Sequence, residues 1–169
     1  MDIKLILTDI DGVWTDGGMF YDNTDLEFKK FNTKDSAGVL FARRAGIEVG
    51  ILTGEDTEIM ARRARKLKID LLHQGVKNKK KLIQEIIAER GIAWENVAYI
   101  GDDLIDIPSL QLAGFSGCPA DAPGYVKDVV HFITPRKGGD GCFRDFIEEL
   151  FTVTGQLEGL VKEIVSDLE

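Results

Sequence analysis

Two aspartates, spaced two residues apart, end a short apolar run near the beginning of the chain. Residues 5–12 read LILTDIDG. An apolar run of this length predicts a buried parallel strand, and this strand presents Asp9 and Asp11 where it ends. Alternation with a period of two places both side chains on one face, and Gly12 allows the backbone to turn. Carboxylates at the carboxyl end of a central strand indicate a ligand crevice in a doubly wound sheet.

The same Asp-x-Asp-Gly pattern also occurs in polar turns and in calcium-binding loops. A calcium loop of the EF-hand type requires a Glu at its twelfth position. Counting from Asp9, that position is Phe20, so this type of calcium loop is excluded. An ordinary polar turn stays open as an alternative on the evidence of this segment alone.

Composition favours a small globular protein and excludes several classes of partner. A chain of 169 residues fits one domain, residues 1–169, with a sizeable core. The net charge of −8 argues against nucleic acid or an anionic membrane surface as the main partner. Lys4 interrupts the apolar residues at the start of the sequence, so we expect no signal peptide there. No apolar run approaches the roughly 20 residues of a membrane span. Cys118 and Cys142 lack metal-ligand spacing, and we expect them to be reduced thiols of a cytoplasmic protein.

Strand-like and helix-like segments alternate along the rest of the chain. Apolar runs predict further strands at 47–52, 69–72, 97–100, 115–118 and 129–133. Helices are predicted at 32–45, 55–67 and 78–90. This alternation predicts an α/β fold with a doubly wound, Rossmann-like parallel sheet. A Gly-rich loop at 137–141 precedes a C-terminal helical region.

Residues 18–31 predict a β-hairpin that protrudes from this sheet. Two short runs with aromatic side chains flank a cluster of turn residues at 22–25. The apolar side chains are many for an exposed ribbon: Met19, Tyr21, Leu26 and Phe28. Because isolated two-stranded ribbons are marginal in water, we expect the hairpin to pack against another subunit. Packing against its own domain is the alternative.

Polar groups follow four of the predicted strands. They are Asp9 with Asp11, Thr53, the loop at 74–81, and Asp102 with Asp103 and Asp106. The carboxyl ends of parallel strands share one edge of the sheet, so the carboxylates repel one another there. Burying them uncompensated is costly, which implies a divalent cation, and ligands that are all oxygen favour Mg²⁺ over zinc. With a hydroxyl and an ammonium nearby, the set describes a phosphate site.

Four ordered segments resemble the motifs of the haloacid dehalogenase superfamily. They are DIDGVWTD at 9–16, LTG at 52–54, QGVKNK at 74–79 and GDDLID at 101–106. The resemblance extends over nearly the whole chain and includes FNTKD at 31–35 and the Gly-rich segment at 136–141. More narrowly, the chain resembles the capless, tetrameric sugar-acid phosphatases that act on eight-carbon and nine-carbon ulosonate phosphates.

The resemblance implies an assembly that covers an open site. Only the hairpin is inserted after the first motif, and residues 53–79 leave room for one helix and one strand, so we expect no cap domain. In the family, hairpins assemble a homotetramer and the C-terminal tail reaches the site of a neighbouring subunit. Residues 136–141 are a candidate for such a flexible, cationic segment, with an ordinary loop before a helix as the alternative.

The resemblance also implies roles for the motif residues. Asp9 would be the nucleophile that forms an aspartyl-phosphate. Asp11 would protonate the leaving alkoxide and then deprotonate the attacking water. Thr53 and Lys79 would bind the phosphoryl oxygens. Three other lysines compete with Lys79 but match the motif less well: Lys77, Lys80 and Lys81.

For the metal, the resemblance implies that Asp102 holds Mg²⁺ together with Asp9 and the backbone carbonyl of Asp11. Asp103 or Asp106 would be a second ligand or would support the ligands from outside.

Glu55 carries the expectation about substrate. In the octulosonate 8-phosphate phosphatases, Arg typically follows the Gly of the second motif, whereas Glu55 stands here. Arg63 and Lys66, further along the predicted helix, are then candidates to bind the substrate carboxylate, and a nine-carbon chain reaches them more easily. We therefore expect 2-keto-3-deoxy-D-glycero-D-galacto-nononate 9-phosphate as substrate. Alternatively, Glu55 is only a favourable acid at a helix N-terminus.

Other functions stay open beside this one. The first alternative is 3-deoxy-D-manno-octulosonate 8-phosphate, a precursor for lipopolysaccharide. A non-catalytic oligomerisation module of the same fold is disfavoured because the motif aspartates, the threonine and the lysine are all present. A phosphatase of broad specificity would show similar kcat/KM values across unrelated sugar phosphates.

Overall fold

The computed structural model describes residues 1–24 and 26–168, and a six-stranded parallel sheet lies at its centre. The strands are β1 (Leu5–Thr8), β4 (Glu48–Leu52), β5 (Leu71–His73), β6 (Val97–Ile100), β7 (Phe115–Cys118) and β8 (Phe132–Ile133). They are ordered β5-β4-β1-β6-β7-β8, and each neighbouring pair is parallel. β1 therefore lies between β4 and β6, and the expected doubly wound α/β fold is confirmed.

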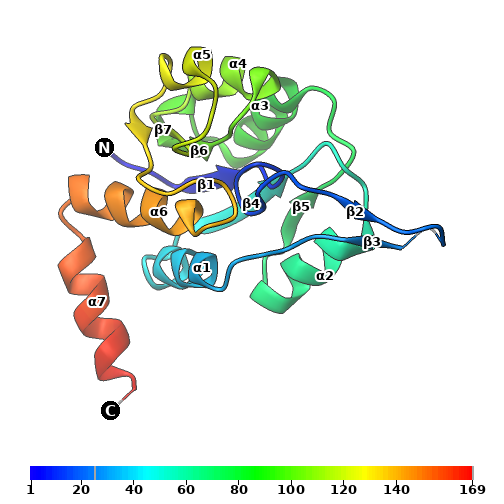
Figure 1. Cartoon of the computed structure of the whole chain (residues 1–169). Helices are drawn as coiled ribbons and strands as arrows, with labels where there is room; N and C mark the ends of the chain where they lie inside the picture. Colours follow the sequence, from blue (N-terminus) through cyan, green and yellow to red (C-terminus); the bar gives the residue numbers. More distant parts are fainter. Residues whose placement is uncertain (25, 169) are drawn as a thin grey trace.

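Helices cover both faces of the sheet (Figure 1). One face carries α1 (Lys34–Arg44), α2 (Glu58–Leu67) and α6 (Cys142–Val153). The other carries α3 (Lys79–Arg90), α4 (Ile107–Leu110) and α5 (Gly124–Lys127). The last helix, α7 (Leu157–Ser166), contacts α1 and α6 and then projects away from the sheet. Across residues 1–24 and 26–168, no helix has both the length and the apolar character needed to span a membrane.

Alternation along the strands divides the apolar side chains between two cores. In β1, Ile6 belongs to the core on the α1 side, whereas Leu5 and Leu7 belong to the core on the α3 side. The same alternation in β6 places Tyr99 on the α3 side and Ile100 on the α1 side. Because both faces of such strands are buried, they read as continuous apolar runs. The sequence therefore locates these strands well.

The hairpin protrudes from the sheet as expected (Figure 1). β2 (Phe20–Tyr21) and β3 (Glu27–Phe28) are antiparallel, with Phe20 opposite Phe28. Four apolar residues of the hairpin have solvent-exposed fractions of 53% to 69%: Phe20, Tyr21, Leu26 and Phe28. The predicted turn at 22–25 includes Asp25, which lies outside the described residues.

Some boundaries differ from those predicted. Helix α2 begins at Glu58 rather than at residue 55, because Thr57 is extended with φ −137° and ψ 146°. Strand β8 begins at Phe132, since the short helix α5 and the turn after it take up the preceding residues. The N–H of Asp128 donates to the carbonyl of Gly124 at 2.9 Å, which keeps this segment helical.

Candidate active site

The carboxyl ends of β1, β4 and β6 open into one cavity of about 180 Å³. Its lining consists of Asp9, Asp11, Thr53, Gly54, Glu55, Asp102, Asp103 and Ile105. The N–H of Asp9 donates to the carbonyl of Ile100 at 3.0 Å, so the chain follows β6 for one residue beyond β1. The structure thus brings together the polar residues that the sequence placed at separate strand ends.

Gly12 turns the backbone directly after the two aspartates. Its φ is +87°, and a Cβ atom added there would lie 1.9 Å from Oδ2 of Asp102. Both the left-handed conformation and the close carboxylate require glycine. The turn thereby lets Asp102 approach the end of β1 from the neighbouring strand.

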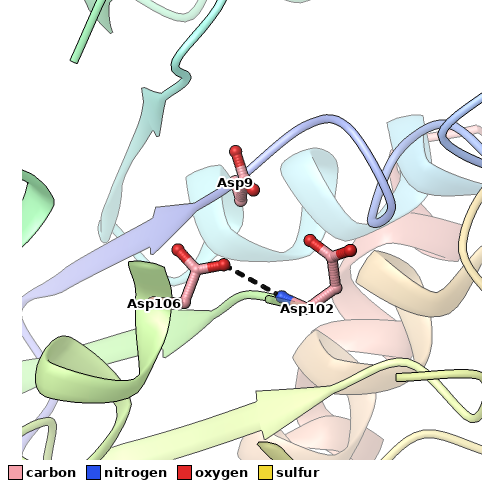
Figure 2. A group of neighbouring side chains, drawn as sticks. All are labelled: Asp9, Asp102 and Asp106. Atoms are coloured by element: carbon pink, nitrogen blue, oxygen red, sulfur yellow. Dashed lines mark hydrogen bonds between the residues drawn. The ribbon is translucent and has the colours of Figure 1, made fainter. Parts of the chain in front are cut away.

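Three carboxylates lie close together at this site (Figure 2). One oxygen each of Asp9, Asp102 and Asp106 lies within 4.8 Å of the others. Asp106 belongs to the short 3₁₀ helix η2 (Leu104–Asp106), and its Oδ2 accepts the N–H groups of Asp102 at 3.1 Å and Asp103 at 3.2 Å. The side chain of Asp103 accepts from the N–H of Leu104 at 2.7 Å.

Lys79 places its ammonium among these carboxylates. It is the first residue of α3, where the side chain of Asn78 accepts from the N–H of Lys81 and caps the helix. Its Nζ lies 2.9 Å from Oδ2 of Asp9 and 2.7 Å from Oδ1 of Asp106. Burial lowers the pKa of Lys79, but the charges of Asp9 and Asp106 outweigh burial and raise it. Lys79 therefore stays protonated.

The site has more negative than positive charge. Burial raises the pKa of Asp9 to about 6 against the opposing charge of Lys79. Burial, then the charges of Asp9 and Asp106, raise the pKa of Asp102 to about 8. Oδ1 of Asp102 is buried, and no hydrogen bond from the described residues reaches it. Three carboxylates around one ammonium, together with this unpartnered oxygen, fit a divalent cation with oxygen ligands.

Tyr99, which no sequence motif indicated, supports the site from β6. Its fully buried hydroxyl donates to Oδ1 of Asp106. Burial and the charges of Asp106 and Asp9 raise the pKa of this phenol well above its ordinary value, so it remains a donor. With Lys79 and two backbone N–H groups, Tyr99 takes up the acceptor capacity of Asp106. A tyrosine within a buried strand needs a partner for its hydroxyl, and that was the available signal.

Lys29 is a second residue of the site that no sequence motif indicated. This hairpin residue places its Nζ 2.8 Å from Oδ1 and 2.9 Å from Oδ2 of Asp11. No local pattern predicts the pair, because it depends on how the hairpin stem packs on the domain.

Thr53 and Glu55 lie on the second strand end. Thr53 is buried, and its Oγ1 accepts the N–H of Glu55 at 3.2 Å. The carbonyl of Thr53 accepts the N–H of Val76 at 3.0 Å, which ties this loop to the one before α3. Glu55 itself is exposed and lines the cavity.

The structure does not bring Arg63 and Lys66 into this cavity. Arg63 donates to the carbonyl of Asn32 at 3.2 Å, and its guanidinium lies 5.8 Å from the ring of Trp14 and 5.2 Å from that of Phe31. Lys66 is exposed on α2. Within one chain, Arg63 therefore joins α2 to the segment after the hairpin, and the substrate-binding role of both residues stays a prediction.

The Gly-rich segment at 136–141 packs against residues 9–16, the catalytic loop after β1, of its own chain. The N–H of Gly139 donates to the carbonyl of Val13 at 2.9 Å, and that of Gly138 donates to Oδ1 of Asp121 at 2.9 Å. Both glycines are buried. This differs from the expectation of a flexible segment that reaches a neighbouring site.

The site combines the paired aspartates after β1, the threonine after β4, the buried lysine at the start of α3 and the aspartates after β6. These residues fit the phosphatase site that the resemblance to the haloacid dehalogenase superfamily implies. A family model described as haloacid dehalogenase-like hydrolase matches residues 32–114. The chain belongs to this family. The expected enzyme class, a phosphoric monoester hydrolase, is confirmed.

Similar proteins cover almost the whole chain. The chain is 34% identical over 171 residues to the 3-deoxy-D-manno-octulosonate 8-phosphate phosphatase of Haemophilus influenzae, an alignment that covers 98% of this chain and 95% of the relative. The enzyme of the same name from Escherichia coli K12 is 36% identical over 157 residues, with coverages of 93% and 84%.

Solved structures agree with these relatives. The crystal structure of the Moraxella catarrhalis enzyme of this name contains a magnesium ion, a phosphate ion and KDO. It matches with a TM-score of 0.91 and 30% identity, and covers 96% of this chain and 93% of that chain. The Yersinia pestis enzyme matches with a TM-score of 0.88 and 36% identity, at coverages of 93% and 85%.

Proposed function

We propose that this protein is a Mg²⁺-dependent phosphatase that hydrolyses the phosphate monoester of 3-deoxy-D-manno-octulosonate 8-phosphate. The observation that carries this proposal is the similarity, along almost the whole chain, to enzymes named for this substrate. The nine-carbon substrate expected from Glu55 has weaker support, so the order of the two candidates is reversed.

The residues of the cavity fit a two-step transfer. A carboxylate oxygen of Asp9 attacks phosphorus, and the bond between phosphorus and the sugar oxygen breaks. Asp11 gives its proton to the leaving oxygen, which departs as the sugar hydroxyl. Asp11 then takes a proton from the water that attacks the phosphorus of the aspartyl-phosphate, which frees Asp9 and inorganic phosphate. Both aspartates line the same cavity, as this sequence of steps requires.

Thr53 and Lys79 are suited to hold the phosphoryl group. The Thr53 hydroxyl lines the cavity, and the Lys79 ammonium contacts the attacking carboxylate of Asp9 at 2.9 Å. Fixed donors of this kind stabilise the charge that spreads over the phosphoryl oxygens in the transition state.

The carboxylates of Asp9 and Asp102, with the carbonyl of Asp11, would hold Mg²⁺. When bound, the ion neutralises negative charge on the phosphoryl group and on the surrounding carboxylates. Asp106, whose oxygens already accept from Lys79, Tyr99 and two N–H groups, keeps the cluster in place.

Phosphate release from a panel of substrates tests the proposal. The panel contains the eight-carbon and nine-carbon ulosonate phosphates, hexose 6-phosphates and glycerol 3-phosphate, each assayed with Mg²⁺. We expect the highest kcat/KM for octulosonate 8-phosphate. Similar kcat/KM values across the panel would indicate a phosphatase of broad specificity, and no turnover at all would indicate a non-catalytic module.

The nine-carbon substrate remains the second candidate because Glu55 lines the cavity. A carboxylate there repels the acid group of a substrate but accepts hydrogen bonds from its hydroxyls. A higher kcat/KM for the nononate 9-phosphate would reverse the order of the candidates.

We also propose a homotetramer in which hairpins from different subunits pack together and a neighbouring subunit covers the open site. The exposed Phe20, Tyr21 and Phe28 of the hairpin support this proposal, because such side chains favour burial at an interface. Sedimentation equilibrium at micromolar concentration tests it, and a fully active monomer would refute it. The cytoplasmic location stays a prediction.

A further inference from the structure

Lys29, the residue directly after β3 of the hairpin, contacts the active-site residue Asp11. None of the side-chain surface of Lys29 is exposed, although the neighbouring Phe28 is 59% exposed. The Lys29 ammonium lies between two carboxylates, in contact with both oxygens of Asp11 and 3.8 Å from Oε1 of Glu27. A buried ammonium is retained only where such partners compensate its loss of hydration. The position of Lys29 is therefore set by charge.

The contacts of Asp11 leave one side of its carboxylate open. Oδ1 receives Lys29 and also the hydroxyl of Thr15 at 3.3 Å, whereas Oδ2 receives Lys29. The side chain of Asp11 is 25% exposed and lines the cavity. The described lining of that cavity does not include Lys29. The lysine thus contacts Asp11 but does not line the cavity.

Orientation is important for the reaction that Asp11 performs. A proton donor has to lie within hydrogen-bond reach of the leaving oxygen when the bond to phosphorus breaks. Asp11 lies in the turn after β1, and the hydrogen bonds described for its carboxylate come from side chains alone. Two contacts from Lys29 and one from Thr15 hold the carboxylate in a single orientation.

We propose that Lys29 is a positioning residue, which holds the carboxyl group of Asp11 in the orientation needed for proton transfer to the leaving oxygen. The proton moves from Asp11 to that oxygen as its bond to phosphorus breaks, and Lys29 gives up no proton. This inference rests on the role of Asp11 in the proposed function. It adds a requirement for the hairpin within the same chain, separate from any contact between subunits.

The leaving group distinguishes positioning from a structural role. An alkoxide needs a proton as it departs, whereas p-nitrophenolate is a stable anion and leaves without one. The value of kcat/KM covers the steps up to transfer of the phosphoryl group to Asp9, so the later attack by water does not enter the comparison. We expect Lys29→Met to lower kcat/KM by about 30-fold or more for octulosonate 8-phosphate and for glycerol 3-phosphate. For p-nitrophenyl phosphate the loss should be less than about 3-fold.

Lys30→Met is the matched control. Lys30 is the next residue, its side chain is 70% exposed, and its Nζ lies 3.7 Å from Asp16. We expect this variant to retain wild-type kcat/KM on all three esters. Should Lys29→Met fold poorly, Lys29→Gln keeps one donor and should show a smaller loss with the same preference for the aryl ester.

Three results would overturn the inference. Equal losses on all three esters would assign Lys29 a structural role. A loss confined to the sugar acid would mean that Lys29 binds the substrate carboxylate, and unchanged kinetics would mean that Asp11 needs no positioning. If the wild-type protein does not hydrolyse octulosonate 8-phosphate, the proposed substrate fails, but glycerol and p-nitrophenyl phosphates still test Lys29.

Discussion

Lys79 and Asp106 form an ion pair enclosed in the protein, with Nζ 2.7 Å from Oδ1 and exposures of 1% and 0% for the two side chains. The same ammonium lies 2.9 Å from Asp9. Removing one partner of such a pair leaves an uncompensated buried charge, which is more costly than the pair itself is favourable. Lys79, which we propose to bind the phosphoryl group, therefore also compensates the charge of two carboxylates.

We predict that Lys79→Met lowers the free energy of unfolding by about 3 kcal/mol in metal-free buffer, because the two carboxylates that contact its ammonium then lack their cation. Urea denaturation measures this loss. Tyr99→Phe is the control, since it removes one hydrogen bond to Asp106 and should cost about 1 kcal/mol. Equal stability of Lys79→Met and the wild-type protein would contradict the described charge arrangement.

Replacing either aspartate after β1 should stop the reaction. In Asp9→Asn the amide cannot attack phosphorus, so we expect kcat to fall by about 1,000-fold or more. Asp11→Asn can neither give nor accept the proton and should also be severely impaired. Thermal unfolding checks that both variants fold, and burial of Asp9 predicts that Asp9→Asn loses no stability. Activity of Asp9→Asn above a few per cent would rule out the covalent mechanism.

Glu55→Ala tests the choice of substrate. If Glu55 contacts the hydroxyls of a nine-carbon chain, its removal should lower kcat/KM for the nononate 9-phosphate by about 10-fold, equivalent to about 1.4 kcal/mol. Turnover of glycerol 3-phosphate should hardly change. An equal loss on both esters would mean that Glu55 serves the loop or the chemistry, and the second candidate would lose its support.

Asp35 should make stability depend on pH. It lies in the first turn of α1 and is buried against the start of α6, where its carboxylate accepts the N–H of Arg144 at 3.3 Å. Burial raises its pKa to about 6. The hydrogen bond from the Arg144 N–H and the charge of Arg63 lower this pKa, and the charge of Asp145 raises it. Because the folded pKa lies above the ordinary carboxyl value of 3.8, the folded state binds the proton more tightly than the unfolded state does. The stability linked to Asp35 is thus present at acid pH and lost as the pH rises through about 6.

We therefore compare the free energy of unfolding of Asp35→Asn with that of the wild-type protein. We expect this difference to shift by about 1 to 2 kcal/mol in favour of the variant as the pH rises from about 5 to about 7.5. Chemical denaturation at the two pH values measures the difference. Asp22→Asn is the control. Hydrogen bonds from Thr24 lower the pKa of Asp22, so Asp22 is ionised at both pH values and its replacement should change stability equally at both. A constant difference between Asp35→Asn and wild type would show that Asp35 ionises normally.

Gly138 supports the catalytic loop by close contact. A Cβ atom there would lie 2.0 Å from the carbonyl oxygen of Gly12, which is backbone and cannot move aside alone. We expect Gly138→Ala to lower kcat by about 10-fold or more and stability by about 1–3 kcal/mol. Gly159→Ala in α7, where nothing lies within 4 Å, should keep full activity and gain up to about 1 kcal/mol. Unchanged kcat in Gly138→Ala would contradict this contact.

The sequence by itself determined which residues stand at the strand ends and which segments are strands. A strand buried on both faces needs a continuous apolar run, so β1 and β6 are visible locally, and Asp9 and Asp102 follow them directly. Parallel strands joined by helices share one polar edge, which is why the site could be assembled from four separate segments. Asn78 as a helix cap and the apolar hairpin were also local signals.

Only the tertiary structure decided what surrounds each of these groups. The contact of Lys29 with Asp11 depends on how the hairpin packs on the domain, and that of Tyr99 with Asp106 depends on how η2 folds back against β6. The contacts of Arg63 with the carbonyl of Asn32 and the ring of Trp14 were likewise not visible locally, and its expected role at the substrate stays a prediction. Such contacts join different elements of the fold, and their energies depend on burial and on neighbouring charges. No local pattern carries that information.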